Sequence, residues 1–326
     1  MKGLAISYKG MEDITELEVN ELLKSPAEIK ESCVIFDIKN MEDLAVLCYK
    51  GQAVNRILLL LDDFKINKIE DLKRISKIDF SEFIQEGKTF AVRSEIVENE
   101  LDDSAVQKTT GDYIEGKVNL KNPDVTVFVY IHRKQCCVGI DFGGDLSKRE
   151  YKIALCRNDL KGTVAYALTR IGGYEKGKSL LNYFCANGTI AIEAALFGSN
   201  ISVNYFNKNK FPFLKFLDFN LEQCDEEKKE AEVYAFDQGG YVRLTKQNAK
   251  VAGVELKFEV SEKVDIVVAN MKNKTKKDYE KLFSLNFKKL VVCSDKEILK
   301  KGGYKTEERE IKHGKETLKI VTFLKP

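Results

Sequence analysis

The sequence predicts an α/β protein in which small α/β modules precede a doubly wound parallel sheet. In the first half of the chain, short apolar runs typical of strands alternate with amphipathic runs at helical spacing. In the second half, buried strands end in loops that lead into helices, and this β–loop–α–β order is typical of a doubly wound sheet. A chain of 326 residues is long enough for two or three domains.

The first 69 residues are predicted to form a ferredoxin-like module. Strands are expected at residues 4–8 and 31–38, helices at 11–23 and 42–49, and a further buried element at 54–61. Two strand–helix–strand units of this size are typical of that module.

A second α/β module is predicted between residues 70 and 145. Its expected strands are residues 87–94, 125–131 and 137–142. A helix is expected to begin near Asp103, with Ser104 as its N-cap, because a hydroxyl can accept a hydrogen bond from a free N–H group of the first turn.

The doubly wound domain is predicted to cover residues 161–326, after a linker at 146–160. Its expected strands are residues 178–184, 233–237 and 264–270. Its expected helices are residues 162–171, residues 190–197 and one that runs through residues 248–250.

The composition is that of a soluble globular protein, with 44% hydrophobic and 32% charged residues. Near the N-terminus the longest apolar run is residues 57–61, far too short to span a membrane, so we expect a cytoplasmic protein with no membrane partner. The eight cysteines form no Cys-x-x-Cys pair and there are only two histidines, so we expect neither a metal site nor a disulfide framework.

Positive charge is concentrated near the C-terminus. The formal net charge is only +2, but residues 271–326 hold 16 Lys and Arg against 8 Asp and Glu. Such a segment could bind phosphate groups. On charge alone, a solvated lysine-rich surface is the favoured interpretation.

Three separated motifs between residues 70 and 152 resemble a THUMP domain. They are residues 87–93, 118–125 and 146–152. THUMP domains occur in enzymes that modify tRNA and, in some families, ribosomal RNA. The resemblance therefore implies that the chain binds RNA.

The last of these motifs supplies candidate RNA-binding side chains. Lys148, Arg149 and Lys152 offer cations to a phosphate backbone, and Tyr151 offers a ring on which a base can stack. The alternative is a basic strand edge with no role in binding.

Residues 180–195 are similar to the S-adenosylmethionine loop of the THUMP-domain RNA guanine-N2 methyltransferases, in which two apolar residues precede Asp-Pro-Phe-Cys-Gly-Ser-Gly-Thr. Phe184 and Gly188 match that pattern, whereas Asn182, Tyr183 and Ala186 replace its Asp, its Pro and its first Gly. Glycine at such a loop lets the backbone approach a cofactor closely. The resemblance implies cofactor contacts from Phe184, Ala186 and Gly188, and binding weakened by Ala186 if that position needs a positive φ.

We expect different roles for two acidic residues of this domain, Asp237 and Glu193. Asp237 ends the second strand and matches the acid that bonds the cofactor ribose in the resembled family, the alternative being a helix N-cap. Glu193, within the helix after the loop, is expected to be structural.

The catalytic motif of the resembled family is Asn-Pro-Pro-Tyr or Asp-Pro-Pro-Tyr, and here it reads Asn270-Met271-Lys272-Asn273. Asn270 is the candidate catalytic residue, because its amide can accept hydrogens of a target amine. The prolines and the aromatic ring are missing, and a nearby lysine places positive charge beside a sulfonium. A strand carrying an adenine-binding Asp is not evident, because residues 256–260 run almost directly into the strand at 264.

Residues 206–220 resemble an aromatic and basic insertion of the same family. Its cations, including Lys208 and Lys210, and its rings could hold single-stranded RNA. A buried aromatic flap is the alternative.

Taken with these departures, the resemblance implies a Rossmann-like methyltransferase domain behind an RNA-binding half. We expect an RNA-binding member of the family with impaired or lost methyl transfer. Its S-adenosylmethionine binding would be weakened or lost, tRNA would be its main partner, and an active methyltransferase paralogue would be a further one. The first alternative is an active S-adenosylmethionine-dependent tRNA guanine-N2 methyltransferase with an atypical site. A scaffold that binds neither RNA nor cofactor has the least support.

Overall fold

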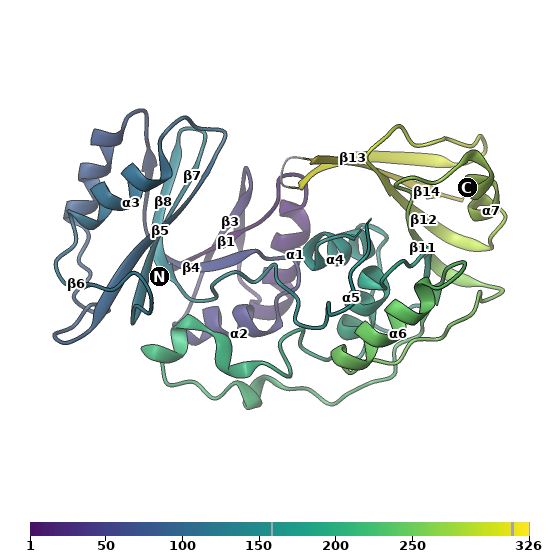
Figure 1. The fold of residues 1–326 in the computed structure, drawn as a ribbon, viewed down its shortest axis with the longest axis horizontal. Coiled ribbons are helices and arrows are strands. Elements are labelled where there is room, and N and C mark those ends of the chain that lie inside the picture. The colour runs from purple at the N-terminus through teal and green to yellow at the C-terminus, as the bar shows by residue number, and fades with distance from the viewer. Residues whose placement is uncertain (158, 314–315, 326) are drawn as a thin grey trace.

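A computed structural model describes residues 1–157, 159–313 and 316–325. Within these residues the chain forms an eight-stranded sheet and a six-stranded sheet. Figure 1 shows an elongated molecule with the N-terminal elements in the middle, β5 to β8 at the left and the second sheet at the right. The expected α/β architecture is therefore confirmed.

The first sheet has the strand order β2-β3-β1-β4-β8-β7-β5-β6. Its strands are β1 (Lys2–Ile6), β2 (Ala27–Lys30), β3 (Cys33–Asp37), β4 (Arg56–Lys65), β5 (Thr89–Val97), β6 (Lys117–Val118), β7 (Val125–His132) and β8 (Gln135–Asp141). Strand β4 pairs antiparallel with β1 on one side and with β8 on the other. The two N-terminal modules therefore share one continuous sheet.

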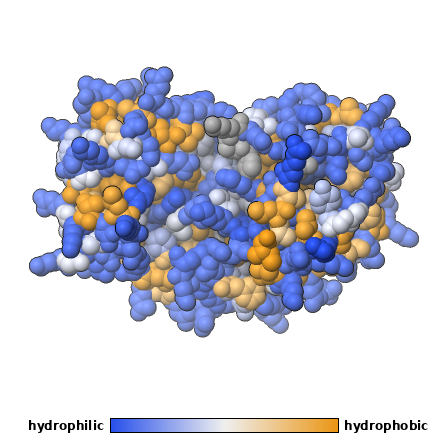
Figure 2. All heavy atoms as spheres, in the orientation of Figure 1, coloured by the Kyte–Doolittle hydropathy of each residue, from blue (hydrophilic) through white to orange (hydrophobic). Residues whose placement is uncertain are grey.

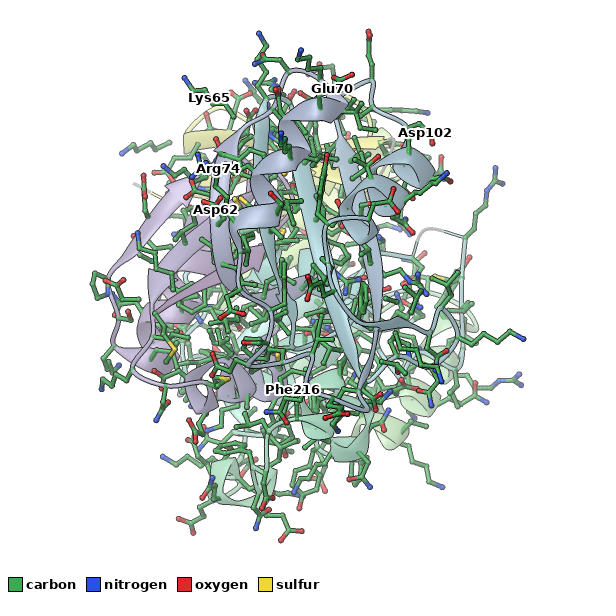
Figure 3. All side chains as sticks on the ribbon, turned by 90° about the vertical axis from the view of Figure 1, so that its left-hand side faces the viewer. Asp62, Lys65, Glu70, Arg74, Asp102 and Phe216 are labelled. Atoms are coloured by element: carbon green, nitrogen blue, oxygen red, sulfur yellow. The ribbon has the colours of Figure 1, made fainter. Side chains whose placement is uncertain are left out.

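The helices of this half are α1 (Glu12–Leu23), α2 (Glu42–Lys50), the 3-10 helix η1 (Ile69–Lys77) and α3 (Asp103–Gly111). Helix α3 is capped by Asp102, whose carboxylate accepts from the Ala105 N–H at 2.8 Å, and Figure 3 labels this residue. The expectation for Ser104 is wrong because Ser104 already lies within the first helical turn, whereas a cap needs the extended backbone that Asp102 has.

The second sheet has the order β10-β9-β11-β12-β14-β13. Its strands are β9 (Leu180–Tyr183), β10 (Val233–Phe236), β11 (Val264–Asn270), β12 (Phe287–Ser294), β13 (Lys305–His313) and β14 (Glu316–Leu324). Strands β10, β9, β11 and β12 are parallel, and β14 and β13 extend them antiparallel. This sheet is the predicted doubly wound core.

Helices cover both faces of the second sheet, because alternate residues of β11 and β12 point to opposite sides. The helices of this domain are α4 (Gly162–Ile171), α5 (Thr189–Gly198), α6 (Tyr241–Ala252) and α7 (Lys276–Phe283). One face of the sheet packs against α4, α5 and α6, and the opposite face packs against α7. Within the described ranges, every helix is too short or too polar to traverse a bilayer.

The segment between α5 and β10 leaves the second domain and packs under the first sheet. It contains the 3-10 helices η2 (Lys208–Lys210), η3 (Pro212–Lys215) and η4 (Leu221–Cys224). Phe211 and Phe213 are buried, and Phe213 stacks on Phe142, which follows β8. Phe216 meets Phe142 edge-to-face at 5.3 Å between ring centroids, and it lies below the sheet in Figure 3. Figure 1 shows this segment running along the lower side of the molecule and back.

The β13–β14 hairpin makes a second connection, from the second sheet to the N-terminal module (Figure 1). Arg309 donates two hydrogen bonds of 2.8 Å to Asp13, and the Lys312 N–H donates to the Lys9 carbonyl at 2.9 Å. A Cβ at Gly10 would lie 1.9 Å from the Glu310 carbonyl oxygen, so only glycine permits this approach. The aromatic segment and the β13–β14 hairpin therefore both connect the second domain to the N-terminal half of the chain.

Candidate active site

A small cavity opens at the carboxyl ends of β9, β10 and β11. Ligands of parallel α/β sheets bind at this edge, where neighbouring strands lead to loops on opposite faces. The cavity is lined by Cys156, Arg157, Phe184, Ala186, Asp237, Tyr241, Asn270 and Lys274. It therefore brings together four sequence-predicted residues: Phe184, Ala186, Asp237 and Asn270.

The β9–α5 loop forms one wall with a run of left-handed backbone. Phe184, Ala186 and Gly188 have φ values of 60°, 53° and 85°. Only glycine adopts this region without cost, so Phe184 and Ala186 are held there by their surroundings. Ala186 thus has the positive φ that was in question. A Cβ at Gly188 would lie 2.4 Å from Thr245 Cγ2, so close packing of the loop on α6 also requires glycine there.

Asp237 is fixed against this loop by two backbone groups. One carboxylate oxygen accepts from the Ala186 N–H at 2.8 Å and the other accepts from the Gln238 N–H at 2.7 Å. Helix α6 begins after Gly240, so the alternative role of Asp237 as its N-cap does not hold. Each oxygen keeps a lone pair that a sugar hydroxyl in the cavity could use.

The replaced residues at the end of β9 are buried beneath the loop. Asn182 donates from Nδ2 to the Val268 carbonyl at 3.1 Å, while its Oδ1 has no hydrogen-bond partner among the described residues. Tyr183 packs on Phe184 and stacks on Phe236. An unpartnered buried oxygen costs free energy, so this position is not fully adapted to its environment.

The residues after β11 place one lysine outside the cavity and another inside it. Asn270 is buried, and its Oδ1 accepts from the Lys272 N–H at 3.1 Å. The Lys272 ammonium pairs with Glu316 at 2.6 Å. Lys274 lines the cavity instead, with its ammonium 4.1 Å from the centroid of the Phe184 ring. Sequence reasoning noted a lysine near this motif but missed Lys274, and only the turn after β11 shows which side chain faces the site.

The region in which an adenine-binding Asp was sought contains only a rudimentary strand. Lys257 pairs in parallel with β10, through a bond from the Ala235 N–H to the Lys257 carbonyl at 2.9 Å and one from the Lys257 N–H to the Val233 carbonyl at 3.0 Å. Within the described part of the chain, the cavity wall contains no residue between α6 and β11.

Two family models match this chain. The model described as an RMKL-like methyltransferase domain matches residues 149–284, and the THUMP domain model matches residues 67–141. A tRNA (guanine(6)-N2)-methyltransferase of Methanocaldococcus jannaschii is 31% identical over 271 residues, which cover 75% of this chain and 71% of the relative. The chain belongs to the THUMP-domain RNA guanine-N2 methyltransferases.

Other members of this family differ in length from the chain. The ribosomal RNA large subunit methyltransferase K/L of Vibrio campbellii is 28% identical over 279 residues, which cover 77% of this chain but 39% of that relative. The chain thus spans about two fifths of that protein.

Solved structures share the whole architecture at low identity. A possible methylase from Clostridium difficile 630 aligns over 100% of this chain and 98% of its own, with a TM-score of 0.80 and 17% identity. TrmN from Thermus thermophilus aligns over 100% of this chain and 99% of its own, with a TM-score of 0.67 and 19% identity. These likenesses establish the fold of the family member described here.

Two of the candidate RNA-binding residues of this methyltransferase-family chain lie inside the molecule. The Arg149 side chain is 1% exposed, and it donates to Glu193 at 2.7 Å and to the Gln52 carbonyl at 2.7 Å. The Tyr151 hydroxyl donates to Glu193 at 2.7 Å. The expectation that Arg149 and Tyr151 contact RNA does not hold, because both side chains are buried and bonded to Glu193. We call the buried network of Gln52, Arg149, Tyr151 and Glu193 the domain seam. The structural expectation for Glu193 agrees with its ion pair.

The other basic candidates are mostly engaged as well. Lys152 pairs with Asp159 at 2.7 Å, and Lys208 pairs with Asp225 at 2.5 Å. Lys210 is half-buried, and burial lowers the pKa of its ammonium. Lys148 is the most accessible of the group, with a side chain 78% exposed and an ion pair to Asp145 at 3.6 Å.

The middle of the insertion that holds Lys208 and Lys210 packs as a buried aromatic flap, whereas Phe206 at its start is exposed. Its rings Phe211 and Phe213 face the first sheet and not solvent, because they complete the apolar core beneath it. Phe206, the first residue of the insertion, is 68% exposed, and exposed apolar side chains also occur on the linker, at Ile153 and Leu155. Figure 2 shows hydrophobic atoms at several places on this face of the molecule.

Three potential metal ligands meet elsewhere, at Glu31, Glu98 and His132. Both carboxylates already pair with cations, which are Lys9, Arg133 and Lys312. These positive charges disfavour a metal ion, and we assign none there.

Proposed function

We propose that this protein is an RNA-binding member of its family, with tRNA as the RNA and with impaired methyl transfer. The observation that carries the proposal is Lys274, whose ammonium lines the same cavity as Asn270. S-adenosylmethionine transfers a methyl group from a positively charged sulfonium, so a cation in that cavity opposes its binding.

The fit of the cavity to this cofactor is partial. Phe184, Asp237 and Gly188 are consistent with a nucleoside site, because they supply a ring, a carboxylate and a glycine turn. Arg157 and Lys274 do not fit a sulfonium, and the loop with Asn270 lacks the prolines and ring that hold a target base. We therefore derive no methyl-transfer step for this chain.

RNA binding is supported by the THUMP match and by the family of the relatives. Among the candidate side chains, Lys148 is the one best exposed to a phosphate backbone. An active methyltransferase that shares the same tRNA is the protein partner that we propose, and the cytoplasm is the proposed location.

The proposal is tested with the full-length protein and total tRNA. We expect saturable tRNA binding whose affinity falls steeply with salt, and no transfer of radiolabelled methyl groups above the level of an Asn270→Ala variant. Lys148→Gln should reduce the slope of the salt dependence by about one, whereas Lys39→Gln, an exposed lysine on the N-terminal module, should not. Absence of tRNA binding would refute the proposal.

The second candidate function is an active tRNA guanine-N2 methyltransferase. It is favoured by the presence of Gly188, Asp237 and Asn270 around the cavity. Methylation of tRNA by the wild type that is lost in Asn270→Ala would establish it and remove the claim of impaired transfer.

A further inference from the structure

We propose that the cavity binds a free nucleoside 5′-phosphate in preference to S-adenosylmethionine. This inference rests on the proposed function, because it assumes that the site keeps its nucleoside walls while methyl transfer is impaired. The proposed ligand carries a negatively charged phosphate, whereas the cofactor that the fold implies carries a positively charged sulfonium.

The charge in the cavity is net positive. Arg157 and Lys274 contribute two positive charges, and Asp237 contributes one negative charge. Both oxygens of Asp237 already accept backbone N–H groups, so part of its charge is compensated before any ligand arrives. A phosphate monoester carries a charge of about −1.5 to −2 at pH 7, which the two cations can balance, whereas a sulfonium would add a third positive charge.

Lys274 forms no close ion pair among the described residues, and its nearest electrostatic partner is an acid that is already hydrogen-bonded. Bonds from Thr275 and, to a smaller extent, the charge of Lys274 lower the pKa of Asp278. Among the described residues, no carboxylate lies within 4.0 Å of the Lys274 ammonium, and the same is true of Arg157. The nearest acid along the chain, Asp278, accepts from the N–H and the hydroxyl of Thr275 at 2.9 Å and so caps α7. The Lys274 N–H donates to the Met271 carbonyl at 3.1 Å, which fixes the turn that directs this side chain over Phe184.

The remaining walls suit the nucleoside part of such a ligand. Phe184 and Tyr241 provide aromatic surface, Asn270 provides an amide, and Asp237 provides acceptors for sugar hydroxyls. A cation above an aromatic ring also gains attraction from that ring, so Lys274 is positioned before a phosphate binds.

The test compares three probes by calorimetry on the full-length protein: adenosine 5′-monophosphate, adenosine and S-adenosylmethionine. A charge-assisted bond to phosphate should make the monophosphate bind about ten to a hundred times more tightly than adenosine. Its affinity should fall with added salt, and that of adenosine should not. S-adenosylmethionine should bind most weakly.

Variants of Lys274 test whether its positive charge causes the preference for the monophosphate. Lys274→Gln should weaken the monophosphate about tenfold or more, leave adenosine within about twofold and strengthen S-adenosylmethionine, whereas Lys274→Arg should keep the preference. Lys277→Gln is the matched control, because this exposed lysine lies on α7 and outside the cavity wall. Thermal unfolding of each variant verifies that the chain is folded.

Three outcomes would overturn the inference: S-adenosylmethionine binding as tightly as the monophosphate, equal affinity for the monophosphate and adenosine, or an unchanged preference in Lys274→Gln. None of these outcomes affects tRNA binding, so a failure here is distinguishable from a failure of the proposed function. Conversely, loss of tRNA binding with a retained phosphate preference would refute only the proposed function.

Discussion

The domain seam and the cavity contrast in how well their polar groups are satisfied. At the seam, Arg149 bonds to Glu193 and to the carbonyls of Leu146 and Gln52, and the Gln52 amide returns a bond to Glu193 at 2.7 Å. At the cavity, Asn182 Oδ1 lacks a partner among the described residues, and Ala186 has a φ that favours glycine. The buried charges of the seam therefore lie in a connected network of hydrogen bonds.

The cavity tolerates features that a purely structural region would avoid. Local departures of this kind persist where the surroundings enforce them, and they occur at functional sites. Ala186 lies in the same cavity wall as Lys274, so one of these local departures is part of the site itself.

The largest expected effect comes from breaking the seam. Arg149→Met leaves the carboxylate of Glu193 buried without its cation, and we expect a loss of about 3–5 kcal/mol in the free energy of unfolding, measured by urea denaturation. The double variant Arg149→Met, Glu193→Met should recover much of that loss, because removing both charges leaves neither unpaired. A loss below about 1 kcal/mol in the single variant would show that the pair is not buried in solution.

The stability of the protein should also depend on pH through Glu18, which lies at the same seam. Burial raises the pKa of Glu18 from 4.5 to about 7, against hydrogen bonds from the N–H groups of Gln52 and Ala53. Because the folded pKa is the higher one, the stability that this group contributes is fully present below pH 4.5 and is lost as pH rises through about 7. The loss is at most about 3 kcal/mol.

Urea denaturation between pH 5 and pH 8 checks this expectation by difference. The wild type should lose more stability over that interval than Glu18→Gln, which has no carboxyl group to titrate. Equal losses in the two proteins would mean that Glu18 does not titrate there.

Adding a methyl group to the β9–α5 loop at Gly188 should lower the free energy of unfolding by about 2–4 kcal/mol. Gly188→Ala combines a φ of 85° with a contact of 2.4 Å to Thr245, so both strain and overlap destabilise it. Gly239→Ala is the matched control, since its φ is 75° but nothing lies within 4 Å of the added Cβ, and we expect about 1 kcal/mol. Equal losses in thermal or urea unfolding would show that the Thr245 contact is unimportant.

The smallest effect has the opposite sign. Ala186→Gly should raise the free energy of unfolding by about 0.5–1 kcal/mol, because glycine removes the strain of a φ of 53°. The same substitution at Ala191, inside α5, should lower it by about 1 kcal/mol. A destabilised Ala186→Gly variant would indicate that the Ala186 methyl group contributes packing that exceeds the strain.

The architecture was accessible from the sequence because its signals are local. Apolar periodicity located α4 and β11 with their exact bounds, and the strand–loop–helix order predicted the parallel sheet. The cap of α3 was misplaced by two residues, since Asp102 and Ser104 are both good capping residues and only the backbone distinguishes them.

The roles of the candidate RNA-binding side chains were harder to predict, because a basic residue in the sequence carries no information on its partner. Arg149 and Lys208 are cations that could meet phosphate, and the structure supplies Glu193 and Asp225 instead, from distant parts of the chain. Lys274 was missed for the same reason, since one turn of backbone decides which of several lysines enters the cavity.

The aromatic segment beneath the first sheet has a practical consequence. Phe211 and Phe213 are encoded within the second domain, yet they complete the core of the first. If the gene were divided at the linker, the N-terminal fragment would lack part of its hydrophobic core. The C-terminal fragment would expose the rings of Phe211 and Phe213 to solvent. The boundary of a functional fragment is thus set by three-dimensional packing, and the two halves would need to be expressed together to remain in solution.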